Sequence, residues 1–255
     1  MKTKKVLITG AAGYLARFVI ARLRANYELT LTDWVDVIAQ PDRSDLQGIR
    51  FIRGDITCES DIENACEGQD AVVHLVALVR ERAGKPPSLF ADVMVKGTWN
   101  VAEACVKHGV QQLVNISSIS MCGAPVNSER AYRVGEPSHF TTGDLSYALS
   151  KSLGEQIGLA YHQAHGLRVI HLRPGVIAGD GRNPGPQRPD NTTEPWFVYV
   201  DPHDVAQAVE CALASDIAYG AYHIVAGRQD SKFDWTSAAQ ELGYAPEYNW
   251  PEIPP

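Results

Sequence analysis

Three polar residues have the types and spacing needed to remove a proton from an alcohol. Tyr147 and Lys151 are four positions apart, so in a helix their side chains project from the same face. A tyrosine has an ordinary pKa of about 10 and is a poor base at neutral pH, but a nearby ammonium group favours the phenolate and lowers that pKa. Ser118 lies just after a predicted strand, residues 112–116, and can hydrogen-bond the same substrate oxygen. We therefore predict Ser118, Tyr147 and Lys151 as catalytic residues, with Tyr147 as general acid and base.

The N-terminal stretch predicts a site for a nicotinamide cofactor that takes the hydride of that alcohol. Residues 4–16 have the pattern of a buried strand, a tight glycine turn and a helix start. Gly10 permits the turn, Gly13 permits a close approach of backbone, and the free N–H groups of the helix start suit a diphosphate. Asp33, which ends the next predicted strand, is placed to accept hydrogen bonds from the adenosine ribose and repels a 2′-phosphate. The predicted cofactor is therefore NAD rather than NADP.

Several of these residues also have an ordinary structural explanation. A lone glycine turn and a lone tyrosine–lysine pair both occur by chance, but their combination with a serine at a strand end favours the functional interpretation. Asp55 is equally well explained as an acceptor for the adenine amino group or as a turn aspartate. His74, inside an apolar run, is predicted to be a core histidine, and His203-Asp204 is predicted to be a polar helix start.

Predicted strands and helices alternate along the chain, which indicates a parallel sheet with right-handed crossovers and helices on both faces. We predict an α/β fold, a doubly wound parallel sheet of the Rossmann type with a small C-terminal substrate cap. Residues 1–174 are the predicted dinucleotide-binding core, and residues 175–255 are a smaller substrate-binding portion interleaved with it. The predicted strands after the first are 27–32, 50–53, 71–77, 112–116, 167–172 and 221–226, and the predicted helices are 14–26, 59–66, 90–108, 146–165, 202–215 and 234–242.

The composition of the chain restricts the kinds of binding partner that we expect. The formal net charge of -7 argues against nucleic acid and against an anionic membrane surface. No apolar run has the length of a transmembrane helix, and the start of the chain lacks the apolar region of a signal peptide, so we expect a cytoplasmic protein with a small-molecule substrate. The five cysteines form no CxxC pair and are expected to be reduced, with no metal site.

Over residues 4–215 the sequence resembles the extended short-chain dehydrogenase/reductases, the NAD-dependent epimerase/dehydratase family. The resemblance is carried by Thr9-Gly10-Ala11-Ala12-Gly13, Asp33, Gly54-Asp55-Ile56, His74-Leu75-Val76-Ala77, Gly97-Thr98-Trp99-Asn100, Ser117-Ser118, Tyr147 with Lys151, and Arg173-Pro174-Gly175. Together with these motifs it implies the cofactor-binding residues Gly10, Gly13, Tyr14, Leu15, Asp33, Asp55, Ile56, Leu75, Val76, Ala77, Tyr147, Lys151 and Pro174. It also implies a homodimer through helices 90–108 and 147–165, whose apolar residues include Ala102, Cys105, Val106, Ile157 and Ala160.

Departures from the family pattern narrow the reaction. Met94 stands where many members have Asn, which removes a proton relay through that helix. Ile119 and Ser120 follow Ser118 where sugar-nucleotide dehydratases carry an Asp-Glu pair, so dehydration is not expected. The stretch after Pro174 is short, and a small cap suits a small, free substrate.

Within the family the chain is most similar to the uronate dehydrogenases, through its length, Trp196-Phe197 before residues 201–205, and its tail, residues 234–246. Their Asn-His after the catalytic serine is Ile119-Ser120 here, and Val79 replaces one of their serines. A carboxylate substrate would need a guanidinium, because its planar fork binds two oxygens. The predicted substrate residues are Ser118, Ser120, Tyr147, Arg182 and Arg188.

The predicted function is hydride transfer between NAD and a small sugar-like alcohol: a sugar, sugar acid or polyol. Two alternatives stay open. One is an NAD-dependent sugar epimerase, which makes product without net NADH. The other is a non-catalytic NAD-binding regulatory protein, although regulatory relatives often lack the Tyr or Lys that this chain keeps.

Overall fold

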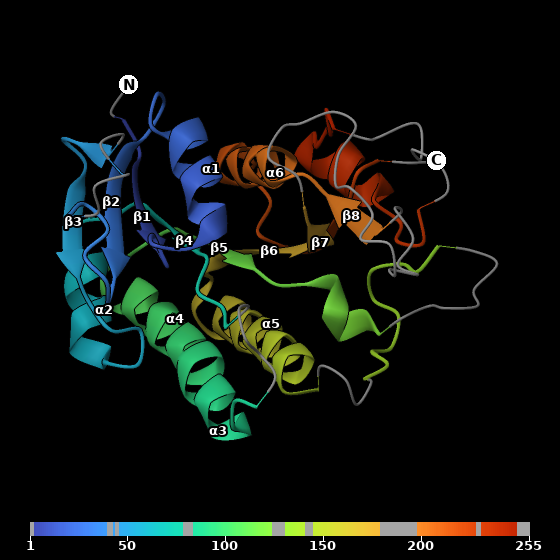
Figure 1. The fold of residues 1–255 in the computed structure, drawn as a ribbon, viewed down its shortest axis with the longest axis horizontal. Coiled ribbons are helices and arrows are strands. Elements are labelled where there is room, and N and C mark those ends of the chain that lie inside the picture. Colours follow the sequence, from blue (N-terminus) through green and yellow to red (C-terminus); the bar gives the residue numbers. More distant parts are fainter. Residues whose placement is uncertain are drawn as a thin grey trace.

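A sheet of seven parallel strands, with helices on both faces, forms the centre of the molecule (Figure 1). The computed structural model describes residues 3–39, 43, 46–78, 84–123, 131–140, 145–178, 198–227 and 231–248. In spatial order the strands are β3 (Arg50–Arg53), β2 (Glu28–Asp33), β1 (Lys5–Thr9), β4 (Ala71–His74), β5 (Gln112–Ile116), β6 (Arg168–Pro174) and β9 (Tyr219–Ile224). The predicted doubly wound parallel sheet is thus confirmed.

The helices divide between the two faces of this sheet (Figure 1). One face carries α1 (Tyr14–Leu23) and α6 (Pro202–Ala214), which pack against each other. The other face carries α2 (Glu59–Cys66), α4 (Gly97–Lys107) and α5 (Leu145–His165). Both β9 and α6 come from residues 175–255, so this part of the chain completes the sheet and one of its helical layers. Two short strands, β7 (Val176–Ile177) and β8 (Tyr199–Val200), form a separate parallel sheet.

The strand β1 shows why the sheet is covered on both sides. Val6, Leu7 and Ile8 are all fully buried. Val6 and Ile8 belong to the core beneath α1 and α6, whereas Leu7 belongs to the core beneath α2 and α4. A strand with helices on both faces must be apolar on both sides, which is why it has a continuous apolar run and no alternation.

The order of the strands reverses between β1 and β4. From β1 the chain continues to β2 and β3 on one side of the sheet, then returns through α2 to β4 on the other side. The last residues of β1 and β4, Thr9 and His74, lie opposite each other in the register. In open parallel sheets, ligands bind outside the carboxyl ends of the strands at such a reversal. The glycine turn after Thr9 therefore lies at the place where this fold binds ligands.

Two predicted helices differ from the structure. The segment predicted as one helix over 90–108 consists of α3 (Pro87–Phe90), a π-helix (Ala91–Lys96) and α4. The Thr98 hydroxyl donates to the Met94 carbonyl at 2.6 Å, and a side chain that occupies a backbone acceptor favours the wider turn. The helix predicted over 234–242 begins at residue 236, and its part over Ala238–Leu242 is a π-helix. The spacing of apolar residues does not reveal the wider turn of a π-helix, so it predicts an ordinary α-helix in both segments.

Two strand ends also differ from the prediction. β4 ends at His74 rather than at residue 77, and β9 spans Tyr219–Ile224 instead of 221–226. Apolar residues continue beyond β4 because residues 75–77 are half-buried, so the apolar pattern alone predicts too long a strand there.

Within the described ranges, no helix combines the length and apolar character needed to cross a membrane. The five cysteines are all free thiols.

Two glycines allow α5 to approach the sheet closely. A Cβ atom on Gly158 would lie 2.5 Å from Cε1 of the His171 ring in β6, closer than real Cβ contacts allow. A Cβ atom on Gly154, one turn earlier, would lie 3.6 Å from Thr98 Oγ1, an ordinary contact. The helix therefore sits at a distance from the sheet that only glycine permits at position 158.

We expect Gly158→Ala to lower the free energy of unfolding by about 1–3 kcal/mol, because the added methyl group overpacks the contact with His171. Gly154→Ala is the matched control, and its better helix propensity should stabilise the protein by up to about 1 kcal/mol. Chemical denaturation measures both. Equal effects of the two substitutions would contradict the close contact at Gly158.

Candidate functional site

Tyr147 and Lys151 lie in the first two turns of α5, and both are buried, with about 7% of each residue exposed. The Tyr147 ring packs against Phe90 and Met94. The Lys151 Nζ lies 5.8 Å from the centre of the Tyr147 ring and donates a hydrogen bond of 2.6 Å to the carbonyl of Ile116, the last residue of β5. The structure therefore places the ammonium beside the phenol and anchors it to a central strand.

Ser118 lies just after β5, where it caps the short 3-10 helix Ile119–Cys122 that contacts α5. Its Oγ accepts a hydrogen bond from the Ser120 backbone N–H at 3.1 Å and donates to Ser120 Oγ at 3.0 Å. The end of β5 and the start of α5 thus carry the three predicted catalytic residues on contacting elements. Ser120, a predicted substrate residue, lies against Ser118.

The glycine turn after β1 is held tightly against its neighbours. The N–H groups of Gly10 and Ala11 donate to the Thr32 carbonyl at 3.1 and 3.3 Å. Gly10 has φ +75°, and a Cβ atom there would lie 3.0 Å from the Val76 backbone nitrogen. A larger residue would therefore be strained in conformation and would push the turn away from the segment after β4.

The start of α1 suits an anionic group. Gly13 is the N-cap and has no side-chain cap hydrogen bond, and the first turn contains no acidic residue. The first N–H groups of α1 and the positive end of its dipole are therefore not offset by a carboxylate of the same turn, which is the arrangement that binds a diphosphate.

Asp33, the last residue of β2, lies directly beside this turn. Its Oδ2 accepts a hydrogen bond from the Ala12 N–H at 3.0 Å, and its Oδ1 accepts one from the Val35 N–H at 3.2 Å. Both bonds come from backbone and fix the carboxylate at the carboxyl end of the sheet. This is the position required for hydrogen bonds to the ribose of a nucleotide, and the residues present here fit NAD.

The other predicted cofactor residues follow the ends of β3, β4 and β6. Asp55 Oδ1 accepts from the N–H and the hydroxyl of Thr57 at 2.8 and 2.9 Å, so this oxygen has the role of a turn aspartate. Leu75 donates its N–H to the Thr9 carbonyl at 3.2 Å, which holds residues 75–77 next to the glycine turn. The remaining predicted residues, Tyr14, Leu15, Ile56 and Pro174, lie at the start of α1, after β3 and at the end of β6.

His74 is a core residue, as predicted. Its Nδ1 lies 2.7 Å from the Thr9 hydroxyl and its Nε2 lies 3.2 Å from the Thr98 hydroxyl. Thr98 donates its own proton to the Met94 carbonyl, so Nε2 of His74 must be the donor and Nδ1 the acceptor. Burial, reinforced by the positive charge of Lys151, lowers the pKa of His74 to about 3, so the ring is neutral at physiological pH.

His203 and Asp204 also have structural roles. Asp201 caps α6, and its Oδ1 accepts from the backbone N–H and the ring Nδ1 of His203 at 2.8 and 2.9 Å. Asp204 accepts from the backbone N–H groups of Glu247 and Tyr248 at 2.8 and 3.1 Å. This pair therefore forms a polar helix start that also holds the segment after Gly243.

An ion pair that the sequence analysis missed joins α5 to β6. Glu155 in α5 and Arg173 in β6 form two hydrogen bonds, Nε to Oε1 at 2.8 Å and a terminal nitrogen to Oε2 at 2.7 Å. Burial by itself would raise the pKa of Glu155, but the hydrogen bonds and charge of Arg173 outweigh it and hold that pKa below its ordinary value. The spacing of Tyr147, Lys151 and Glu155 at intervals of four was the signal available in the sequence.

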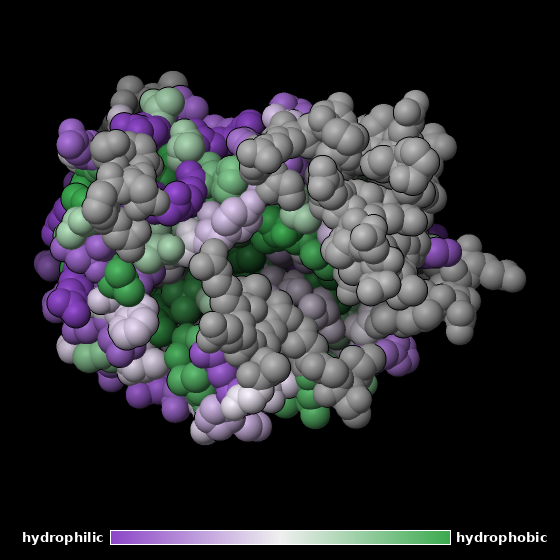
Figure 2. All heavy atoms as spheres, in the orientation of Figure 1, coloured by the Kyte–Doolittle hydropathy of each residue, from purple (hydrophilic) through white to green (hydrophobic). Residues whose placement is uncertain are grey.

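Hydrophobic side chains line a hollow near the centre of the face shown in Figure 2, close to where Figure 1 draws β4 and β5.

Several predicted residues fall outside the described part of the chain: the substrate arginines Arg182 and Arg188, together with Val79, Trp196 and Phe197.

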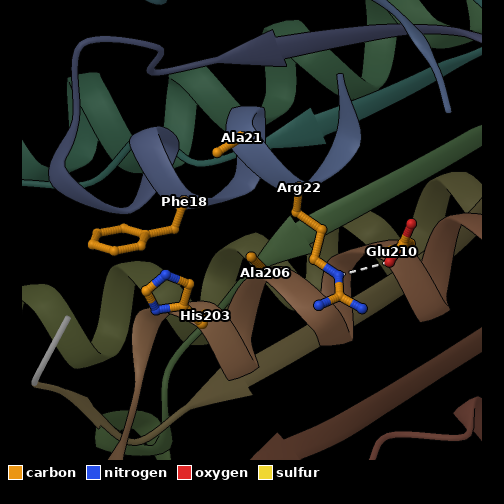
Figure 3. A pocket seen from close by; sticks show the side chains of 6 residues that line it. All are labelled: Phe18, Ala21, Arg22, His203, Ala206 and Glu210. Carbon is orange, nitrogen blue, oxygen red and sulfur yellow. Dashed lines mark hydrogen bonds and ion pairs between the residues drawn. The ribbon is translucent and has the colours of Figure 1, made fainter. Parts of the chain in front are cut away.

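A cavity of about 410 Å³ lies elsewhere, between α1 and α6 (Figure 3). Among its lining residues, the Phe18 and His203 rings pack edge to face with their centres 4.8 Å apart. Arg22 forms an ion pair with Glu210, in which Nε lies 2.6 Å from Oε2. Its lining residues include no predicted site residue, and it lies on the face of the sheet opposite α5. We therefore assign the candidate site to the carboxyl ends of the strands and not to this cavity.

We expect Gly10→Ala to weaken NADH binding by on the order of 100-fold, because the added Cβ atom displaces the turn from Val76. Gly48→Ala is the matched control, since Gly48 also has positive φ (+82°) but a Cβ atom there would meet nothing within 4 Å. Fluorescence titration with NADH measures both. Similar losses in the two variants would mean that backbone strain, and not the contact with Val76, is responsible.

Comparison with known proteins identifies the family of this chain. The model of the NAD dependent epimerase/dehydratase family matches residues 6–198. The NAD-dependent glucose-6-phosphate dehydrogenase of Haloferax volcanii is 25% identical, over 97% of this chain and 95% of that protein. The L-arabinose 1-dehydrogenase (NAD(P)(+)) of the same organism is also 25% identical, over 96% of this chain and 97% of that protein.

Solved structures share the fold. Uronate dehydrogenase from Agrobacterium tumefaciens has a TM-score of 0.77 at 22% identity, covering 100% of this chain and 92% of that one. UDP-N-acetylglucosamine 4-epimerase from Bacillus cereus has a TM-score of 0.77 at 23% identity, covering 97% of this chain and 95% of that one. With the family model matched over most of the chain, this protein belongs to the NAD-dependent epimerase/dehydratase family of enzymes.

Proposed function

We propose that this protein is an NAD-dependent dehydrogenase that oxidises a hydroxyl group of a small, free sugar or sugar-like alcohol. The observation that carries the proposal is the buried Tyr147 with the Lys151 ammonium 5.8 Å from its ring centre, beside the end of the strand that precedes Ser118. Full-length relatives that act on single sugars support the substrate class.

In the proposed reaction Tyr147 removes the proton of the substrate hydroxyl. Lys151, held by the Ile116 carbonyl, supplies the positive charge that favours the phenolate. The Ser118 hydroxyl holds the substrate oxygen in position, and Ser120 fixes the orientation of Ser118 through two hydrogen bonds. Bound NAD supplies the acceptor for the hydride that leaves the substrate carbon. In the reverse direction Tyr147 returns the proton as a general acid.

The choice of NAD over NADP follows from Asp33. Its carboxylate is fixed by the N–H groups of Ala12 and Val35 next to the glycine turn. A negative charge held at the ribose position accepts the two ribose hydroxyls and repels a 2′-phosphate.

For the substrate, we propose a sugar or sugar acid, with a uronate as one option. The relatives named above act on glucose 6-phosphate and L-arabinose by their names, and the uronate dehydrogenases share the fold. Arg182 and Arg188 stay our candidates for binding a carboxylate or phosphate of the substrate.

We expect NADH to form with at least one member of a panel of aldoses, sugar phosphates, uronates and polyols. Tyr147→Phe removes the general base and should lower kcat by about 100- to 10,000-fold. Tyr161→Phe is the matched control, since Tyr161 lies on the same helix but hydrogen-bonds Trp99 and Glu103. The assay follows NADH absorbance.

A panel that yields no NADH with any member would contradict a dehydrogenase. Formation of an epimer without net NADH would instead favour the epimerase alternative, and NAD binding without any product would favour a regulatory role.

We also propose that the protein is a homodimer through α4 and α5. Ala102 and Cys105, which the sequence analysis named for this surface, are buried inside the monomer and do not form it. The exposed large apolar residues of the two helices are Trp99 (55% exposed), Leu145 (48%), Leu149 (42%) and Leu153 (41%). The three leucines follow at intervals of four along α5, so they form one stripe suited to a second copy of the helix.

Leu149→Glu together with Leu153→Glu should convert a dimer to a monomer, because each places a charge in an apolar interface. Sedimentation at micromolar concentration measures the mass. Val176→Glu is the control, since Val176 is similarly exposed (41%) but lies outside both helices. A wild-type protein that sediments as a monomer would contradict the proposal.

A further inference from the structure

The helix α5 carries three buried polar side chains along a single stripe. Tyr147, Lys151 and Glu155 follow at intervals of four, so all three lie on the same side of the helix, and all are buried. The proposed chemistry uses the first two and leaves Glu155 without a role. Glu155 lies eight residues after Tyr147, which is about 12 Å along the helix axis.

Glu155 connects α5 to the end of β6. Its carboxylate binds the fork of Arg173, the residue before Pro174 at the end of β6, through bonds of 2.8 and 2.7 Å. One carboxylate therefore joins α5 to the end of β6, the neighbour of the strand to whose last carbonyl Lys151 is bound.

Among the buried titratable neighbours of Arg173 in the part of the chain that the structure describes, only the Glu155 carboxylate carries a negative charge at neutral pH. Burial lowers the pKa of His171 and of His223 to about 4 and raises the pKa of Cys122 to about 11. Burial likewise raises the pKa of Tyr132 to about 12. These neighbours are neutral at pH 7, so among them Glu155 supplies the negative charge.

The side chains of the pair are about 5% and 9% exposed, so water screens it little. A bidentate guanidinium–carboxylate pair in such surroundings sets direction as well as distance, because both bonds must be nearly coplanar. It therefore fixes the rotation of α5 and its position along the helix axis against the sheet.

We propose that Glu155 is a positioning residue for the proposed catalytic site, which holds α5 in the register where Lys151 reaches the Ile116 carbonyl and lies beside the Tyr147 ring. This inference rests on the proposed function for the role of Tyr147. Without Glu155 the helix loses its attachment to the end of β6, Lys151 loses its anchor on Ile116, and the ammonium moves away from the phenol.

The test compares Glu155→Gln with the wild-type enzyme in kcat, in NADH binding and in the titration of Tyr147. Isotope-labelled tyrosine Cζ, observed by NMR with NAD bound and assigned with Tyr147→Phe, reports the titration without any substrate. We expect kcat to fall on the order of 100-fold, as for a misplaced catalytic group, with little change in the NADH dissociation constant. We expect the phenol to titrate at higher pH than in the wild type.

The direction of that shift separates positioning from simple electrostatics. Loss of the Glu155 negative charge alone would favour the phenolate and move the titration to lower pH. Separation from Lys151 moves it to higher pH. Glu63→Gln is the matched control, because it breaks the exposed ion pair with Lys107 between α2 and α4 and should leave both readouts unchanged.

A Tyr147 titration that is unchanged, or that moves to lower pH, overturns the proposal, whatever the stability of the variant. If Glu155→Gln does not fold, Arg173→Lys decides by the same readouts, since it keeps the charge but loses the planar fork. It should then give smaller shifts in the same directions, and wild-type values would overturn the proposal. A wild-type protein without turnover refutes the proposed function, whereas the Tyr147 titration still decides the role of Glu155.

Discussion

The close contact between α5 and the sheet is the constraint on which the rest of the candidate site depends. Gly158 allows the helix to lie against the His171 ring, where any larger residue would collide with it. At this distance Lys151 reaches the Ile116 carbonyl and Glu155 reaches Arg173. A helix even slightly further out would lose both contacts, because hydrogen bonds tolerate only a few tenths of an ångström.

The topology of the sheet brings the predicted cofactor residues to the same edge. Parallel strands end on one side, so the turns after β1, β2 and β4 lie together although they are far apart in the chain. Backbone hydrogen bonds then fix their relative positions: Thr32 holds the glycine turn, Ala12 holds Asp33, and Thr9 holds Leu75. The site needs few side-chain contacts for its cofactor half because the main chain already positions it.

Buried polar residues behind the site are kept neutral or paired. His74 and His171 lie in the core and have lowered pKa values, because burial disfavours their charged forms. Lys151 and the Glu155–Arg173 pair are the buried charges of α5 and β6, and each is hydrogen-bonded. The charged groups of this region are therefore those that lie on α5 or bind it, and each is paired because an unpaired buried charge would be costly.

Local sequence patterns determined much of this protein. The continuous apolar run of Val6, Leu7 and Ile8 predicted a strand buried on both faces, the glycine turn and Asp33 predicted a dinucleotide fold, and the spacing of Tyr147 and Lys151 predicted that they share a helical face. These succeeded because turn conformation, helical periodicity and two-sided burial act over a few residues. The tertiary structure alone decided the Glu155–Arg173 pair, the neutral bridge of His74 between Thr9 and Thr98, and the π-helix before α4. Each of these depends on contacts between residues distant in the chain, or on one side chain competing for a backbone acceptor. Such contacts leave no periodic signal in a single sequence.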